Sequence, residues 1–379
     1  MKTYNVAVVG AGGWIGGVHS DCWIRATSLL PSDLGACLHT AVDLDPGALS
    51  AAGARYGFKK TTTKFEDAVN DPEVDIIDIC CSNQFHKDVA VAAAKAGKAI
   101  ICEKPISITM EDAREMVAAA KKYDIFNRSC FMYREYPSLL FIKELVENGT
   151  LGKVMHIRIQ FEQDFYCDPD EPYTWRFNME TSGGGSIVTL GAHVVDLARF
   201  FAGDFDSVIA NFQTAIPERP TVRGGKEMAK VTVDDEAAAL VKFKNGATGI
   251  IHTNWLNHGR KHHVEMELCG SKATILFNSE RLNEICIYEA SGDKKIRGFK
   301  NVLVGAEHPN GELFNQKTGM GIGVKEAFSM VSVNFVKDIA SGVKGKIPTF
   351  EDGLINLAYI KKIQESHEKN AWVSIGDIL

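Results

Sequence analysis

The spacing of apolar and polar residues divides the chain into two regions of different character. Up to about residue 126, short apolar runs typical of buried strands alternate with segments of helical periodicity. Strands that alternate with helices build a parallel sheet through right-handed crossovers. We therefore predict a doubly wound α/β domain of the Rossmann type over residues 1–126. Its expected strands are 6–9, 41–42, 76–81 and 99–102, and its expected helices lie near 16–30, 46–56, 64–70, 86–96 and 109–122.

The pattern changes after Phe126. A further helix is expected at 137–148, and beyond it apolar and polar residues alternate with a period of two, which is typical of half-buried strands. Turn sequences such as Lys244-Asn245-Gly246 favour antiparallel pairing. We predict that residues 127–379 form an α+β domain with a large, open, mostly antiparallel sheet, and that its last helices, near 325–341 and 350–368, pack back on the first domain. The expected strands are 153–163, 206–215, 235–243, 247–255, 262–269, 272–277 and 284–289.

Length and composition narrow the class of protein. A chain of 379 residues suits two domains, and 45% hydrophobic with 24% charged residues is ordinary for a globular protein. The net charge of −6 argues against a nucleic-acid partner. We find neither an apolar stretch of membrane-spanning length nor a signal peptide, and we expect a cytoplasmic protein without a membrane partner. The nine cysteines include no Cys-x-x-Cys pair, so we expect reduced thiols and no metal site.

A glycine-rich turn follows the first strand. It can be read as G-x-G-x-x-G in two registers, each with one mismatch: Gly10 and Gly12 place Ile15 third, whereas Gly13 and Gly16 place Ala11 first. A strand that feeds a glycine loop and then a helix leaves backbone N–H groups free to bind a pyrophosphate. We therefore assign this loop to a dinucleotide, with cofactor contacts from Gly10, Gly12, Gly13, Trp14 and Ile15.

An acidic residue, Asp43, ends the second expected strand. A carboxylate there accepts hydrogen bonds from the ribose hydroxyls of the adenosine half and repels a 2′-phosphate. The next residues, Leu44 and Asp45, offer no cation to such a phosphate. The sequence thus favours NAD over NADP. The alternative is that Asp43 only caps the helix that begins near Pro46.

Two further loops should open at the same edge of the sheet. Ser82, Asn83 and His86 follow the third expected strand, and Glu103 and Lys104 follow the fourth. We expect these five residues to lie around the nicotinamide half of the cofactor. Lys104 precedes a proline, which restricts its backbone and allows a cis bond. It can hydrogen-bond a substrate hydroxyl and move its proton, whereas the alternative is an ordinary surface turn.

A histidine, His193, follows Gly183-Gly184-Gly185 and should lie in the first turn of a helix that begins near Gly191. Beside a mobile backbone it is a candidate general base, although histidines at such places are also structural hydrogen-bonding groups. His262 and His263 are weaker candidates on a strand end.

The chain resembles the Gfo/Idh/MocA family of oxidoreductases along essentially its whole length. The resemblance rests on the glycine loop, on Cys102-Glu103-Lys104-Pro105, on Tyr133-Arg134-Glu135-Tyr136-Pro137, and on Gly191-Ala192-His193-Val194-Val195-Asp196. Stretches such as Gln163-Asp164-Phe165 and Trp175-Arg176-Phe177 resemble the sugar and polyol dehydrogenases of the family. The resemblance implies NAD(P)-linked oxidation of a secondary ring hydroxyl, and dimers or tetramers formed through the C-terminal sheet.

The resemblance also implies site residues. Lys104 and His193 take the catalytic positions, and Tyr133, Gln163, Trp175, Arg176 and Thr189 take positions near the substrate. Trp175 and Arg176 could equally be a packing residue and a salt-bridge partner. In many relatives an aspartate stands where this chain has Thr189. A hydroxyl stabilises an imidazolium less than a carboxylate does, so His193 should be a weaker base here, or Lys104 should bear more of the proton transfer.

We expect an enzyme that oxidises a secondary hydroxyl of a cyclic sugar, glycoside or polyol with NAD, or catalyses the reverse reduction. A pyranoside oxidised at C3 ranks above inositol oxidised at C2. One alternative is an enzyme that retains NAD and uses transient oxidation for glycoside cleavage. Another is a non-catalytic NAD-binding sensor.

Overall fold

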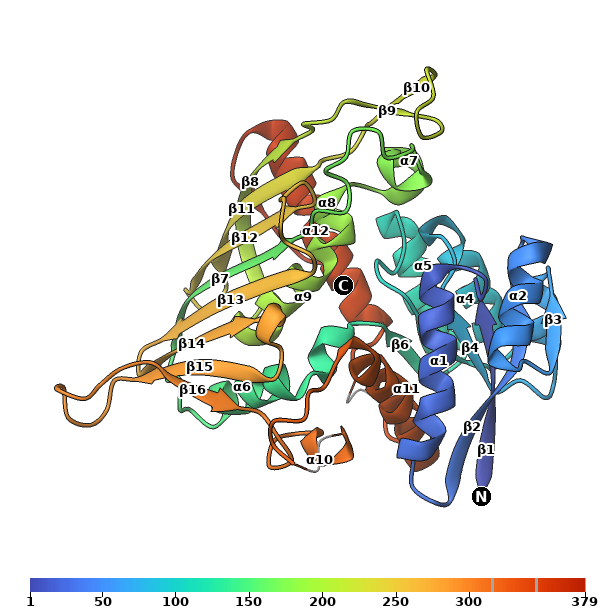
Figure 1. Ribbon diagram of the computed structural model, residues 1–379, viewed down its shortest axis with the longest axis horizontal. Helices are drawn as coiled ribbons and strands as arrows, with labels where there is room; N and C mark the ends of the chain where they lie inside the picture. The colour runs from blue at the N-terminus through green and yellow to red at the C-terminus, as the bar shows by residue number, and fades with distance from the viewer. Residues whose placement is uncertain (315–316, 345–346, 379) are drawn as a thin grey trace. The chain divides into compact units, whose positions relative to one another are not determined.

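The computed structural model describes residues 1–314, 317–344 and 347–378. The chain divides into two compact units, and each is discontinuous in sequence. The first unit comprises Met1–Glu135 and Gly323–Ile355, and the second comprises Tyr136–Ile322 and Asn356–Leu379. Figure 1 shows the elements of both. These units are defined by how the chain packs and not by sequence pattern. The domain limits 1–126 and 127–379 therefore stay predictions.

The first unit contains a six-stranded sheet of order β3-β2-β1-β4-β5-β6, and every pair of neighbours is parallel. The order reverses between β1 and β4, which is the topological switch point where doubly wound sheets bind ligands. The predicted doubly wound sheet is confirmed. Its strands are β1 (Lys2–Val9), β2 (Leu34–Val42), β3 (Lys60–Thr62), β4 (Ile76–Ile79), β5 (Ala99–Cys102) and β6 (Asn127–Ser129), and its helices are α1 (Trp14–Leu29), α2 (Pro46–Tyr56), α3 (Phe65–Asn70), α4 (His86–Lys95), α5 (Met110–Lys122) and α11 (Val324–Ser341).

The late helix α11 completes the first unit by packing along α1. The ring of Phe328 lies 5.1 Å from that of His19, and Arg25 forms an ion pair with Glu326. All nine cysteines are free thiols, and four of them are buried in this unit. These four are Cys22, Cys80, Cys102 and Cys130.

The second unit contains a nine-stranded sheet of order β16-β15-β14-β13-β7-β12-β11-β8-β17. Only its central pair, β7 and β12, is parallel, so the predicted mostly antiparallel sheet is confirmed. The strands are β7 (Val154–Glu162), β8 (Phe205–Gln213), β11 (Glu236–Phe243), β12 (Thr248–Asn254), β13 (His263–Gly270), β14 (Ala273–Asn278), β15 (Glu284–Glu289), β16 (Lys300–Leu303) and β17 (Val373–Ser374), with a separate pair β9 (Glu218–Pro220) and β10 (Met228–Lys230).

Helices cover one face of the large sheet. In Figure 1, α6 (Pro137–Glu147), α8 (Ser186–Thr189), α9 (Gly191–Ala202) and α12 (Phe350–Lys369) lie on the same side of it, and α7 (Met179–Ser182) and α10 (Gly311–Phe314) lie near its ends. On β11 the residues that point to the opposite face, Ala238, Leu240 and Lys242, are exposed, while those between them are buried. This is the open face that the period of two predicts.

Within the described residues, no single helix is both long and apolar enough to span a membrane. The segments 179–189 and 191–202 pass this test only together, and they are bent by 49°. Buried core helices pass the same test, and α9 is mostly buried.

Candidate active site

The glycine loop follows β1 and leads into α1. Gly10 has a φ of +90°, and a Cβ there would lie 2.7 Å from the backbone nitrogen of Cys81. A Cβ on Gly12 would lie 2.6 Å from the Cβ of Ala48, and one on Gly16 only 2.0 Å from the carbonyl oxygen of Gly10. Gly10, Gly12 and Gly16 therefore leave no room for a side chain. Gly10 and Gly12 belong to one predicted register and Gly16 to the other, so the last glycine comes one residue later than in G-x-G-x-x-G.

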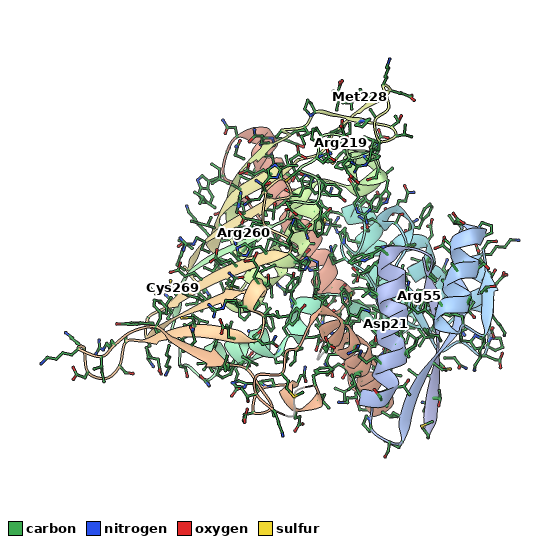
Figure 2. The ribbon with its side chains drawn as sticks, in the orientation of Figure 1. Asp21, Arg55, Arg219, Met228, Arg260 and Cys269 are labelled. Atoms are coloured by element: carbon green, nitrogen blue, oxygen red, sulfur yellow. The ribbon has the colours of Figure 1, made fainter. Side chains whose placement is uncertain are left out.

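The loop presents backbone groups and one aromatic side chain. Gly13 is the N-cap of α1 and supplies no capping side chain, so the first N–H groups of this helix have no side-chain cap that would compete with an anion. Trp14 is 79% exposed, and Ile15 is half-buried. A cavity of about 390 Å³ lies beside the loop, between α1 and α2, and its lining includes Gly12, Gly13, Trp14 and Arg55. Figure 2 labels Arg55 and one further lining residue, Asp21 of α1.

Asp43 binds the glycine loop. One of its carboxylate oxygens accepts a hydrogen bond of 2.9 Å from the backbone N–H of Gly12. The N-cap of α2 is Asp45 instead, whose carboxylate accepts bonds of 2.7 Å and 3.0 Å from the N–H groups of Gly47 and Ala48. The alternative that Asp43 is only a helix cap is therefore wrong. A carboxylate joined to a loop without room for side chains fits the adenosine end of NAD.

The loops after β4 and β5 are joined by His86. Its Nε2 lies 3.0 Å from the carbonyl oxygen of Cys81, and its Nδ1 lies 3.1 Å from that of Pro105. Burial lowers the pKa of His86, although these carbonyl groups act in the opposite direction. The side chain is fully buried. The observed role of His86 is to hold the two loops together, and its contact with the cofactor stays a prediction. The other predicted residues of the β4 loop, Ser82 and Asn83, are half-buried at its start.

Lys104 lies directly after β5, at the carboxyl edge of the sheet. It is half-buried, its bond to Pro105 is cis, and its backbone N–H donates to Oε2 of Glu103 over 3.1 Å. Glu103 is 7% exposed, and its other oxygen lies 3.0 Å from Nε2 of His19. Tyr133 also belongs to this unit, in a short 3₁₀ turn, and is 1% exposed. Glu103 and Tyr133 are thus almost fully enclosed in the protein.

His193 lies in the first turn of α9, as expected, and is half-buried. Thr189 is the last residue of α8, and the bend between the two helices falls at Leu190. Asp234 holds the turn before α8: its carboxylate accepts bonds of 2.8 Å from the N–H groups of Gly185 and Ile187, and one of 2.7 Å from the hydroxyl of Ser186. This network fixes the segment that leads to His193.

An aromatic side chain, Phe161 of β7, gathers three of the polar candidates. Its ring centroid lies 6.0 Å from that of His193 and 4.9 Å from that of His262. The amide nitrogen of Gln163 lies 3.2 Å from Nδ1 of His262. The structure therefore brings His193 and Gln163 together around Phe161 and His262. Neither Phe161 nor its role was identified from the sequence, because its place in an alternating strand indicated only a core residue.

Trp175 and Arg176 form a pair of their own in a 3₁₀ turn, Trp175–Phe177. The guanidinium of Arg176 lies 4.6 Å from the centre of the Trp175 ring, at cation–π distance. Both side chains are half-buried, so each keeps a surface that a ligand can reach.

Two buried acids and a histidine were missed by the sequence analysis. They are Asp234, Asp78 and His19. The available signals were weak: Asp234 lies in a Val-Asp-Asp turn, Asp78 is an acid inside an apolar strand, and His19 lies three residues after Gly16.

A sheet of this order, with a glycine loop at a helix N-terminus and an acid after the second strand, defines a dinucleotide-binding protein. Residues 4–126 match the family described as "Oxidoreductase family, NAD-binding Rossmann fold", and residues 139–276 match "GFO/IDH/MocA C-terminal domain". The chain belongs to the Gfo/Idh/MocA family. It is an NAD-dependent oxidoreductase that acts on CH–OH groups, so the predicted family, enzyme class and cofactor are confirmed.

The relatives carry the names of sugar and polyol dehydrogenases. The chain is 34% identical to levoglucosan dehydrogenase of Pseudarthrobacter phenanthrenivorans, and the match covers 100% of both chains. A solved structure of levoglucosan dehydrogenase in complex with NADH and levoglucosan matches with a TM-score of 0.95 at 33% identity, over 99% of this chain and 100% of that one. Myo-inositol 2-dehydrogenase of Thermotoga maritima is 28% identical over 69% of this chain and 74% of its own length.

Proposed function

We propose that this protein oxidises a secondary ring hydroxyl of a pyranoside or anhydro-sugar, preferably at C3, with NAD as the oxidant. The full-length similarity to levoglucosan dehydrogenase supports this substrate class. The observation that carries the chemistry is the position of Lys104, since the glycine loop and Lys104 follow two strands of one parallel sheet at its carboxyl edge.

The chain's own residues divide the work of binding and proton transfer. The glycine loop and Asp43 hold the adenosine and pyrophosphate end, where the carboxylate of Asp43 excludes a 2′-phosphate and so selects NAD over NADP. When bound, NAD supplies a hydride acceptor for the carbinol carbon. Lys104 hydrogen-bonds the substrate hydroxyl, and its single proton is taken up by one of two bases, the neutral amine of Lys104 or the imidazole of His193.

The substrate would be held by polar and aromatic side chains of the types that bind sugars. Gln163 and His262 offer hydrogen bonds beside the ring of Phe161, and the stacked pair Trp175 and Arg176 offers an aromatic face and a cation. Tyr133 and Thr189 stay proposals from the family resemblance. Because Tyr133 is 1% exposed, its contribution would be a hydroxyl at the wall of the site.

A second candidate is an inositol dehydrogenase. The similarity to myo-inositol 2-dehydrogenase favours it, although this match covers less of the chain at lower identity. A cyclic polyol offers the same secondary hydroxyl to the same pair of proton-handling groups, so only the substrate contacts would differ.

We also propose that the protein works in the cytoplasm as a homo-oligomer joined through the open face of the large sheet. The nine free thiols suit a reducing compartment, and exposed apolar side chains such as Leu240, which is 49% exposed, suit burial against another copy.

The test is the rate of NADH formation with levoglucosan, methyl glucosides, 3-deoxy analogues and inositols. We expect turnover with the anhydro-sugar or a glucoside, none with the analogues that lack the C3 hydroxyl, and weaker turnover with inositols. Preferred turnover of an inositol would replace the first candidate by the second. No NADH formation with any substrate would contradict both.

A further inference from the structure

A buried cluster of charged groups lies behind the Lys104 loop, wholly within the first unit. His19 projects from α1 and is 4% exposed, between Asp78 of β4 and Glu103. Its Nδ1 lies 2.9 Å from Oδ2 of Asp78, and its Nε2 lies 3.0 Å from Oε1 of Glu103. One imidazole ring thus joins an acid in the middle of the sheet to the acid that precedes Lys104.

The hydrogen bonds of the cluster bear on where its protons lie. The indole N–H of Trp23 donates to Asp78 over 2.7 Å, and the backbone N–H of Lys104 donates to Glu103 over 3.1 Å. Both acids therefore accept hydrogen bonds. Each nitrogen of His19 faces a carboxyl oxygen, which is the arrangement in which an imidazolium donates two hydrogen bonds.

We propose that His19 is a positioning residue for Lys104: as an imidazolium it neutralises Asp78 and Glu103 in part, and it fixes the carboxylate that holds the backbone of Lys104. This inference rests on the proposed role of Lys104 in proton transfer. It adds a residue that never touches substrate, together with a charge state that the protein must keep.

The electrostatics of the neighbours agree with this charge state. Burial by itself lowers the pKa of His19, but the charge of Asp78, its hydrogen bond and the neighbouring Cys80 and Cys130 together raise the pKa well above its usual value. Burial raises the pKa of Glu103, whereas His19 and the charge of Lys104 lower it below its usual value. The other titratable groups that face the ring, Cys80 and Cys130, have thiol pKa values raised by burial and stay neutral.

The charge of His19 is therefore coupled to Lys104. Without the imidazolium, the negative charges of Glu103 and Asp78 would lie in the interior without the positive charge of His19. Glu103 would then take up a proton. It would then cease to attract the ammonium group of Lys104, whose proton would leave at lower pH.

The experiment compares H19Q with H39Q. His39 is a matched control because it is a histidine of the same unit, 2% exposed on β2, whose Nδ1 lies 2.9 Å from the hydroxyl of Thr40. For H19Q we expect kcat to fall about a hundredfold, because an imprecisely placed catalytic group costs this much. We expect the KM for sugar and the Kd for NADH to change less than about threefold, since the binding surfaces remain.

The pH profile separates positioning from a merely structural role. In the plot of kcat against pH, the limb that reflects the titration of Lys104 should lie about one pH unit lower in H19Q than in wild type. H39Q should keep the wild-type profile. A fall in kcat with an unchanged profile, together with matched losses of thermal stability in H19Q and H39Q, would overturn the proposal.

A second measurement needs no activity. In NMR spectra of the wild-type protein labelled at histidine, the signal lost in H19Q should still show a doubly protonated ring well above the usual histidine pKa of about 6.5, since the two acids hold that proton. If H19Q does not fold, D78N identifies the same signal by its shift. If His19 titrates near pH 6.5 or below, the proposal is overturned. It is also overturned if the wild-type protein contains one equivalent of zinc and H19Q contains none. A wild type that oxidises no sugar defeats the proposed function, while this titration still decides the state of His19.

Discussion

The two units hold their candidate catalytic side chains by different physical means. In the first, titratable side chains from α1, β4 and the β5 loop meet in the interior, and the backbone of Lys104 is bonded to one of them. In the second, Asp234 binds the backbone of a glycine turn ahead of His193, and a Cβ on Gly185 would lie 1.8 Å from the carbonyl oxygen of Asp234. The backbone of Lys104 is thus held through a buried cluster of hydrogen-bonded side chains, and the segment that leads to His193 by a close fit of the backbone.

Removal of Lys104 should have the largest effect. K104M removes the ammonium group, and we expect kcat to fall about a thousandfold, within the range for a lost proton-transfer group. NADH binding, measured by fluorescence titration, should stay within a few-fold of wild type. K122M alters an exposed lysine of α5 and should leave kcat unchanged. A loss of kcat below tenfold in K104M would remove the lysine from the mechanism.

Replacement of His193 should cost less. For H193A we expect kcat to fall about a hundredfold, because the hydroxyl of Thr189 supports the imidazolium less than an aspartate would, so Lys104 bears more of the proton transfer. The control is H156A, which changes a histidine of β7 bonded to the hydroxyl of Thr248. If H193A loses more activity than K104M, the order of the two groups is reversed.

The cofactor preference tests a direct contact in the first unit. D43S removes the carboxylate that repels a 2′-phosphate, and we expect the preference for NAD over NADP in kcat/KM to fall at least about tenfold. D45S is the matched control two residues further on, because serine preserves the N-cap of α2. An unchanged preference in D43S would assign the selection to other groups.

The smallest effect on rate, and the clearest pH signal, should come from Asp234. Burial raises the pKa of Asp234 to about 6, although its three hydrogen-bond donors lower it. Between about pH 4 and pH 6 the folded state then binds more protons than the unfolded state, so the free energy of unfolding falls as pH rises, by about 3 kcal/mol from this group. In D234N this decrease should vanish from urea unfolding curves, and kcat should fall only a few-fold. If the free energy of unfolding of D234N falls with pH as it does in wild type, the decrease arises from groups other than Asp234.

The sequence predicted those parts of the molecule that depend on local pattern. The long strands and helices carry clear periodicity, whereas β3 and β6 were missed because each has three residues and no apolar run. The glycine loop, Asp43, Lys104 and the helix of His193 were placed by their positions after strands or before a helix.

The residues that support the site could not be read in this way. His19 contacts residues 59 and 84 positions further along the chain, and no period relates them. Asp43 and Asp45 both precede the same helix, and which of them caps it follows only from the fold, in which Asp45 is the N-cap. His86 was assigned to the cofactor because it follows a strand, yet its side chain turns inward to two carbonyl groups.

The discontinuous first unit has a consequence for synthesis. Its helix α11 lies along α1, and the backbone carbonyl of Lys325 accepts a weak hydrogen bond from the thiol of Cys22. The carbonyl of Val331, also in α11, accepts a hydrogen bond from buried Arg128 of β6. A ribosome releases this helix only after residues 136–322 of the second unit. We expect the first 135 residues, made alone, to expose the apolar side of α1 and to aggregate. The nucleotide-binding sheet, although synthesised first, would stay without this covering helix until residues 136–322 have also been made.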